Sequence, residues 1–189
     1  MLNAIVSAKN QDTCDAITLL LSECGFNNIK TVLTGAEVRK QYEITDFDLA
    51  VICTPLEDEF GLDLVSHIYK NSESAVVVLA NSDVADEIQK KVAFANAFVL
   101  SRPLNKLVFL QCIKYVMLSR EEILRLKSEN TELQQKMRDL KLIDRAKCML
   151  IQYLRISETQ AHRHIQKQAM DQRITQTAVA MDILKTYEN

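Results

Sequence analysis

Apolar and polar positions change their spacing several times along the chain, and each change predicts an element. Continuous apolar runs predict strands at 4–6, 49–53, 75–80 and 97–100, and the mixed segment 29–33 predicts a further one. Between these runs, apolar residues three or four apart predict helices at 12–24, 36–42, 61–70 and 83–94. The runs at 49–53 and 75–80 are apolar throughout, as in strands that are buried on both faces. Five strand–helix units in series therefore predict an α/β fold with a parallel, flavodoxin-like (βα)5 sheet.

A long helix is predicted to begin near Leu104, since the sequence has no Gly or Pro from there onward. With heptad position a at 116, 123, 130 and 137, position d falls on leucine at 126, 133 and 140. This spacing predicts about three heptads of coiled coil. Asn at position a favours a parallel two-stranded coil, so we expect a homodimer. The residues expected at the dimer contact are Ile123, Leu126, Asn130, Leu133, Met137 and Leu140. The alternative is an amphipathic helix that lies on its own domain.

The last part of the chain is predicted to form three short helices. The first continues the long helix, and Ser157 with Gln160 forms a capping box that starts the second. The third is expected at 175–186. We interpret Met149, Met170 and Met181 as core residues of this bundle. The predicted domains are 1–118, the coiled-coil helix 119–140, and the all-α three-helix segment 141–189.

Charge separates the ends of the chain, although the net charge is only −2. Residues 1–118 hold 10 Lys and Arg against 15 Asp and Glu, a net −5, while residues 141–189 hold 8 against 5, a net +3. We therefore expect any polyanion to bind the C-terminal segment. The five cysteines form no CxxC and no zinc spacing, which is typical of reduced thiols in the cytoplasm. The sequence shows no signal peptide and no apolar run near the roughly 18 residues of a membrane span, so no membrane contact is expected.

The N-terminal segment resembles the receiver domains of response regulators in two-component systems. The resemblance is carried by the five-unit pattern, by "DLAVIC" with Gly61 eight residues after Cys53, by "VVVLA" and by "LSRP". It implies a phosphoacceptor aspartate after the third strand, a position that Cys53 holds here. The other positions at which receivers carry their acidic pair, hydroxyl and lysine are also changed, to Ser7, Ala8, Ala80 and Arg102.

These departures predict a pseudo-receiver that takes no phosphoryl group, because Mg²⁺ prefers carboxylate oxygens and none remains at these positions. Such a domain would serve as a scaffold, a dimerisation unit or a docking surface for a regulatory protein. Two alternatives stay open beside this interpretation. Glu57, Asp58 and Glu59 could hold a metal, although a solvated loop is the simpler explanation. Cys53 could be a redox switch if Arg102 lowers its pKa, although a buried, inert thiol is the simpler explanation.

The C-terminal segment resembles the ANTAR domain, an RNA-binding module of bacterial transcription antiterminators. The resemblance is carried by Ala146-Lys147, Ser157-Glu158 with Ala161, Ala169-Met170 with Arg173, and Ala180 with Ile183-Leu184. Cys148 departs from the family, which usually has Gly after Ala-Lys. The order of receiver-like domain, coiled coil and ANTAR domain also matches the family.

The resemblance implies binding to leader mRNA stem-loops and transcription antitermination, with RNA polymerase affected only indirectly. Lys and Arg would hold phosphates, and polar side chains would contact unstacked loop bases. The residues expected to bind RNA are Lys147 and Arg173 first, then Arg145, Arg163 and Lys167. His162, His164, Thr175 and Gln176 are further possible hydrogen-bond partners, and the two histidines do not share a helix face, so no metal site is expected.

The alternative function is a DNA-binding transcriptional regulator with a pseudo-receiver docking domain. Three short helices could hide a helix-turn-helix, but no Gly lies between 157 and 175 for a tight turn. An enzyme is not expected, because the sequence shows no nucleophile–base pair, glycine-rich phosphate loop, metal cluster or cofactor motif.

Overall fold

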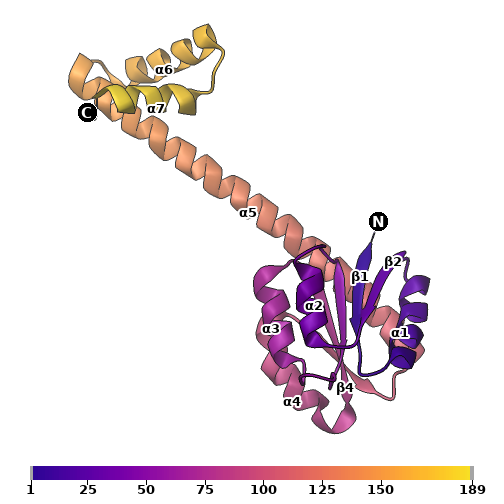
Figure 1. Ribbon diagram of the computed structural model, residues 1–189. Coiled ribbons are helices and arrows are strands. Elements are labelled where there is room, and N and C mark those ends of the chain that lie inside the picture. The colour runs from indigo at the N-terminus through magenta and orange to yellow at the C-terminus, as the bar shows by residue number, and fades with distance from the viewer. Residues whose placement is uncertain (1, 188–189) are drawn as a thin grey trace. The chain divides into compact units, whose positions relative to one another are not determined.

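The computed structural model describes residues 2–187, which divide into two compact units at the boundary between Leu124 and Arg125. The first unit is an α/β fold around one parallel sheet in the order β2-β1-β3-β4-β5 (Figure 1). This is the predicted flavodoxin-like order, in which the chain reverses direction across the sheet between β1 and β3. The fold class predicted from the sequence is therefore confirmed.

The observed elements begin and end within two or three residues of their predicted bounds. The strands are β1 (Asn3–Ser7), β2 (Asn28–Val32), β3 (Leu49–Cys53), β4 (Ala75–Asn81) and β5 (Phe98–Arg102). The helices of the first unit are α1 (Gln11–Glu23), α2 (Gly35–Tyr42), α3 (Leu62–Asn71) and α4 (Ser82–Val92), followed by a 3-10 turn at Ala93–Ala95. The long helix is α5 (Lys106–Leu154), and α6 (Glu158–Gln172) and α7 (Gln176–Tyr187) complete the chain.

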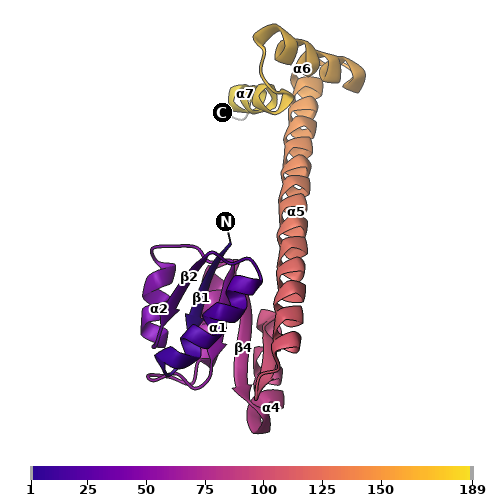
Figure 2. The same ribbon diagram turned by 90° about the vertical axis from the view of Figure 1, so that its right-hand side faces the viewer.

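Helices cover both faces of the sheet, as the fully apolar strands predicted (Figures 1 and 2). Alternate residues of β3 point to opposite faces. Ala50 and Ile52 pack with α2, α3 and α4, while Leu49, Val51 and Cys53 pack with α1 and the start of α5. Each face therefore has its own apolar core.

The first turns of α5 belong to the core of the first unit. Phe109, Ile113 and Val116 are buried there against the sheet. Val116 occupies the first position of the predicted heptad pattern, so that position cannot contribute to a dimer. Among the predicted heptad positions of α5, the exposed apolar residues begin at Ile123.

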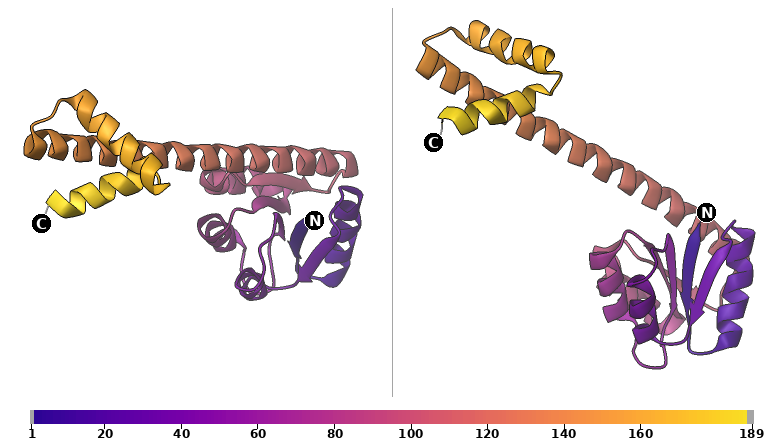
Figure 3. Two further views of the ribbon diagram at one scale, coloured as in Figure 1. Left: turned by 90° about the horizontal axis from the view of Figure 1, so that it is seen from above. Right: turned by 45° about the horizontal axis from the view of Figure 1, so that its top comes forward.

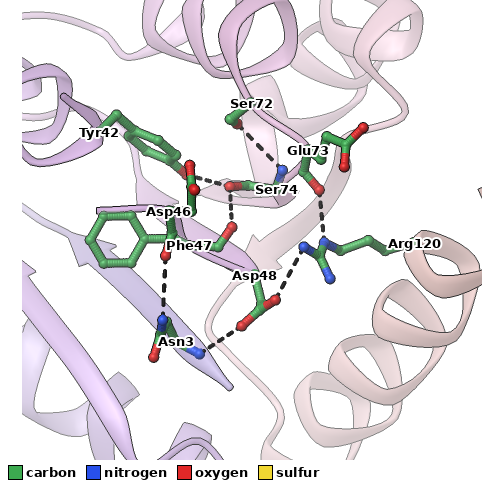
Figure 4. Close-up of polar contacts among 9 residues, drawn as sticks. All are labelled: Asn3, Tyr42, Asp46, Phe47, Asp48, Ser72, Glu73, Ser74 and Arg120. Atoms are coloured by element: carbon green, nitrogen blue, oxygen red, sulfur yellow. Dashed lines mark hydrogen bonds and ion pairs between the residues drawn. The ribbon is translucent and has the colours of Figure 1, made fainter. Parts of the chain in front are cut away.

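Arg120 fastens α5 to the amino edge of the sheet (Figure 4). Its Nη2 lies 3.1 Å from the Asp48 carboxylate, and its Nε donates to the Glu73 carbonyl at 2.7 Å. The other oxygen of Asp48 accepts the Asn3 backbone N–H at 2.8 Å. The single carboxylate of Asp48 thus ties α5 to the beginning of β1.

A second polar chain supports the same edge of the sheet (Figure 4). The Tyr42 hydroxyl donates to Ser74 Oγ at 2.9 Å, and Ser74 Oγ donates to the Phe47 carbonyl at 2.5 Å. The Tyr42 ring packs edge-on against the Phe47 ring. Burial raises the pKa of Tyr42 to about 12, so the hydroxyl stays protonated and remains a donor.

The second unit is a helical bundle formed by the end of α5 with α6 and α7 (Figure 3). Its core is small and consists largely of alanine and branched aliphatic residues: Ala146, Leu150, Ala161, Ile165, Ala169, Val179, Ala180, Ile183 and Leu184. The predicted capping box is present at the start of α6, where Ser157 and Gln160 exchange hydrogen bonds. Among the helices of residues 2–187, none is long and apolar enough to cross a membrane.

We expect Arg120→Ala to lower the free energy of unfolding by about 1–3 kcal/mol, because it leaves Asp48 and the Glu73 carbonyl without a charged donor. A matched control is Lys91→Ala, which breaks the exposed i,i+4 pair with Glu87 and should cost at most about 0.5 kcal/mol. Thermal unfolding followed by circular dichroism compares the two variants. Equal melting temperatures would show that the Arg120 interactions do not stabilise the fold.

Candidate functional site

The degenerate receiver positions come together at the carboxyl edge of the sheet. Ser7 ends β1 beside Ile52, and Cys53 ends β3 beside Leu79. Ala80 pairs with Ser101, and Arg102 ends β5 beside Asn81. This is the edge at which parallel α/β sheets place ligands and reactive groups. The four neutral residues of the site, Ser7, Ala8, Cys53 and Ala80, are all buried, so the edge is filled by apolar atoms and one hydroxyl.

Arg102 turns its guanidinium onto the backbone of this edge. It donates to the Thr54 carbonyl and lies 3.5 Å from the Leu79 carbonyl. Thr54 directly follows β3, and Leu79 lies in β4, where its carbonyl also accepts the Thr54 backbone N–H at 2.9 Å. Among the described residues, Arg102 Nε and Ser7 Oγ are buried without a hydrogen-bond partner. The guanidinium of Arg102 therefore binds carbonyl oxygens of the protein itself. The lysine at this position in a receiver would instead bind a phosphoryl group.

The Cys53 thiol is held in its neutral form. Only 2% of the residue is exposed, and burial raises its pKa to about 12, although the charge of Arg102 acts in the opposite direction. A nucleophilic or oxidation-sensitive cysteine needs thiolate character and access to solvent. The environment of Cys53 supplies neither, which favours the inert thiol over the redox switch.

The acidic loop after β3 serves to fasten the fold. The Asp58 carboxylate accepts the backbone N–H groups of Gly35 and Ala36 at 2.8 and 3.0 Å, at the start of α2. Burial acts to raise the pKa of Asp58, but these N–H groups outweigh it and hold the pKa below its usual value. Glu59 forms a two-pronged ion pair with Arg39, at 2.6 and 3.0 Å.

A side chain at position 35 would displace the Glu59 carboxylate from this ion pair, because a Cβ there would lie 1.7 Å from Glu59 Oε1. Over the residues that the structure describes, no group of three or more His, Cys, Asp and Glu side chains is arranged to hold a metal. Asp58 binds backbone N–H groups of α2 and Glu59 binds Arg39, so both carboxylates have structural partners. These partners favour a structural loop over a metal site.

Lys147, the first of the expected RNA-binding residues, lies between two helices. Its Nζ contacts Asp144 at 2.7 Å and Glu158, in the first turn of α6, at 3.1 Å. Only 16% of its side chain is exposed. Hydrogen bonds to the two carboxylates raise the pKa of Lys147. The geometry therefore indicates that Lys147 links α5 to α6, and that its positive charge is already balanced by two carboxylates.

The outward face of α6 carries cations that are open to solvent. Arg163 and Lys167 are exposed and lie four residues apart, so they share one face of the helix. His162 and His164 are exposed on either side of Arg163. Arg145 is exposed on α5.

Arg173 connects α6 to α7 in a left-handed conformation. Its φ is 54°, and its N–H and that of Ile174 close the end of α6 onto Met170 and Ala169. Thr175 then caps α7 by accepting the Ala178 N–H at 3.2 Å. A tight turn thus forms between α6 and α7 without glycine, and the absence of Gly gives no argument against a helix-turn-helix. The Arg173 side chain is exposed at the tip of this turn.

A hollow of about 450 Å³ lies beside this turn. It is lined by Gln166, Ala169, Met170, Ile174 and Gln176. Met170 is 79% exposed, so the expectation that it is a core residue was wrong. Met181 is also largely exposed at 44%, whereas Met149 is partly buried against the core as expected. The periodicity could not separate these methionines, because Met170 follows the buried Ala169 by one residue and lies just outside the core face.

The predicted dimer stripe is exposed on α5. Leu126, Leu133, Met137 and Leu140 each have between 50% and 62% of their surface exposed. Ile123, at the start of the stripe, is 36% exposed. Asn130 is exposed as well, and its Oδ1 accepts a hydrogen bond from Gln134 at 2.8 Å. Every residue from 125 to 138 is exposed.

Sequence reasoning did not identify Gln166, Ile174 or the tyrosine pair as surface features. Tyr153 and Tyr187 stack at the ends of α5 and α7 with ring centroids 4.9 Å apart. Gln166 lies one turn after Arg163 on α6. This spacing was the one hint in the sequence that Gln166 lies near the basic residues.

Known proteins match both parts of the chain. Residues 131–184 match the ANTAR domain family, beginning inside the helix that was predicted as coiled coil. Over 167 residues the chain is 26% identical to the transcriptional regulatory protein PdtaR of Mycobacterium tuberculosis, covering 88% of this chain and 82% of that protein.

Two solved structures match the first unit. One is a CheY-like response regulator receiver domain protein from Methanospirillum hungatei JF-1, with 20% identity, a TM-score of 0.58, and coverage of 65% of this chain and 98% of that one. The other is a two-component response regulator from Clostridium difficile, with 18% identity, a TM-score of 0.56, and coverage of 62% and 96%. The receiver fold and the ANTAR domain, both inferred from the sequence, are thereby confirmed.

The burial of Cys53 predicts its reactivity. At pH 8 a thiol with a pKa near 12 is ionised in about one molecule in 10⁴, so iodoacetamide should leave Cys53 unlabelled in the native protein. Cys148, which is exposed, is the internal control and should be labelled. Peptide mass spectrometry after labelling, and after peroxide treatment, reads both sites at once. Modification of Cys53 at a rate near that of Cys148 would contradict the inert thiol and support the hypothesis that Cys53 is a redox switch.

Proposed function

We propose that this chain, a response-regulator-like protein with a receiver fold and an ANTAR domain, binds leader mRNA stem-loops and prevents transcription termination without being phosphorylated. The observation that carries the proposal is the exposed basic face of α6, Arg163 and Lys167, next to Arg173 at the following turn. RNA hairpins present phosphates and unstacked loop bases, and such cations suit the phosphates. RNA polymerase would be affected only through the shape of the transcript.

Phosphorylation independence is supported by the carboxyl edge of the sheet. Cys53 is buried and neutral, Ala80 offers no hydroxyl, and Ser7 and Ala8 offer no carboxylate for Mg²⁺. Arg102 contacts strand carbonyls. A regulatory protein that docks on the pseudo-receiver, or the dimerisation equilibrium itself, would then set the activity in the cytoplasm.

A parallel coiled-coil homodimer is supported by the exposed stripe on α5. Four large apolar side chains in water are unfavourable, and pairing with a second copy would bury them. Two ANTAR domains in one dimer could bind two hairpins of the same leader. Binding of the second hairpin would then be intramolecular, which raises the overall affinity without a new interaction.

The first experiment is a gel-shift titration over a salt series, with a two-hairpin leader RNA from the same genome and a duplex DNA control. Arg163→Ala with Lys167→Ala should weaken RNA binding by at least about tenfold. The slope of log K against log salt should become shallower by about 0.7–0.9 for each phosphate that the variant no longer neutralises. Acetyl phosphate with Mg²⁺ should leave the affinity of the wild type unchanged.

Three further variants give the comparison its controls. Arg173→Asn removes the charge but keeps a residue that tolerates positive φ, so a decrease in affinity reports the charge alone. Lys185→Ala removes one cation from α7 and should have little effect. Lys147→Met should lower the melting temperature without changing the salt slope, because Lys147 is already paired. Equal affinity for duplex DNA and hairpin RNA would instead favour the DNA-binding regulator.

The dimer has its own test. Leu126→Glu, Asn130→Lys and Leu133→Glu together should give a monomer, since all three side chains lie on the exposed stripe. Affinity for the two-hairpin RNA should fall by about 10²–10⁴, while affinity for a single hairpin stays unchanged. Sedimentation and gel shift measure the two effects. Gln135→Lys, off the stripe, is the control, and a monomer that keeps full affinity for the two-hairpin RNA would contradict the role of the dimer.

A further inference from the structure

We propose that the hollow beside the α6–α7 turn receives a single unstacked base of the RNA loop, an inference that rests on the RNA-binding function proposed above. The hollow is formed by one flank of α6, the left-handed turn at Arg173 and the first turn of α7. Its volume of about 450 Å³ lies within the roughly 300–1,000 Å³ of small-ligand pockets. It therefore offers space for one planar group, and the identity of that group follows from its lining.

Two glutamines from different helices line the hollow. Gln166 lies on α6 and Gln176 on α7, and among residues 2–187 neither side chain has a hydrogen-bond partner. Each amide carries two donors and an acceptor with two lone pairs. A carboxylate or an ammonium ligand would use only half of this capacity. The polar edge of a nucleobase, with donors and acceptors side by side, would use both halves.

The remaining walls are apolar although they face water. Met170 is 79% exposed and Ile174 is 39% exposed, and Ala169 forms the floor. A thioether is polarisable and packs well against an aromatic ring. A base has two apolar faces besides its polar edge, so this combination of walls and amides fits a base better than it fits a sugar or a phosphate.

The charges around the hollow fit the backbone on either side of such a base. Lys167 and Arg163 lie on the same outward face of α6 as Met170, one and two turns before it. Arg173 lies between Met170 and Gln176 at the tip of the turn. A nucleotide whose base enters the hollow would place its neighbouring phosphates near these cations. The exposed Asp171 lies beside Met170, so the surroundings carry three cations, Arg163, Lys167 and Arg173, against this one carboxylate. The hollow is thus amphipathic inside with a cationic excess around it, which suits loop recognition.

The test combines RNA and protein changes. The probe is the two-hairpin leader RNA of the gel shift, with each loop nucleotide replaced in turn by an abasic nucleotide. Replacement at one loop position should weaken binding to the wild type by about tenfold or more. 2-Aminopurine at that position should become more fluorescent on binding, because its base leaves the stack.

The protein variants are Gln166→Ala and Met170→Ala, with Gln172→Ala and Met181→Ala as matched controls. The control residues are exposed on α6 and α7 but do not line the hollow. Each hollow variant should weaken binding of the intact RNA by several-fold, because Gln166→Ala removes a hydrogen-bonding amide and Met170→Ala removes a surface that packs against the base. On the abasic RNA the hollow variants should bind almost as well as the wild type does. The interaction between the base and the hollow is already lost there, so the two changes are not additive.

The possible results separate the two proposals. If the wild type binds the leader RNA but the hollow variants behave like their controls on both RNAs, the base is recognised elsewhere and this inference alone is overturned. The same holds if no abasic position has an effect beyond the others. If the wild type binds no hairpin RNA, the proposed function fails, and the inference fails with it.

Discussion

One helix, α5, contributes to a hydrophobic core in each of the two units, and the rest of the structure depends on that double use. Its first turns bury Phe109, Ile113 and Val116 against the receiver sheet, and its last turns bury Ala146 and Leu150 against α6 and α7. Neither unit could do without its part of α5, because that part forms a wall of its core. A Gly or Pro between the two parts would interrupt the helix at a cost of about 1–3 kcal/mol, and the sequence contains neither there.

The fold could be predicted from the sequence because its signals are redundant. A strand such as Leu49–Cys53 is apolar at every position, which is consistent only with burial on both faces, and the series of strand–helix units then leaves few topologies. The start of α6 was equally clear, because Ser157 and Gln160 form a local motif that needs no tertiary partner. The heptads indicated a stripe, but only the structure could show that Val116 is already used by the receiver core. Periodicity gives the direction of a side chain and does not give the surface that it meets.

The candidate site was harder to predict, because charge says nothing about pairing. Lys147 and Arg163 look alike in the sequence, yet one lies between Asp144 and Glu158 while the other faces solvent. Their difference depends on which helix face meets which neighbour, a property of the packed bundle. The same limit applied to Asp58, whose carboxylate meets backbone N–H groups 22 and 23 residues away. The hollow depends on the left-handed turn at Arg173, and a non-glycine residue with positive φ has no reliable signature in sequence.

The absence of receiver chemistry changes what can regulate such a protein. A phosphorylated receiver is switched by a covalent charge, which acts whatever the protein concentration. Here Ser7, Ala8, Cys53 and Ala80 are buried and uncharged. If the domain takes no phosphoryl group, as proposed, a switch would act by binding, and its effect would follow mass action. In a dimer that binds two hairpins, the concentration of the chain, that of the leader RNA and that of any partner on the pseudo-receiver enter one linked equilibrium. Under the proposed function, a partner that favours the monomer would lower RNA affinity without contacting the proposed RNA-binding residues, because it would remove only the intramolecular binding of the second hairpin. The modest charge of each ANTAR domain fits this arrangement, since a domain that bound a single hairpin tightly would be insensitive to it.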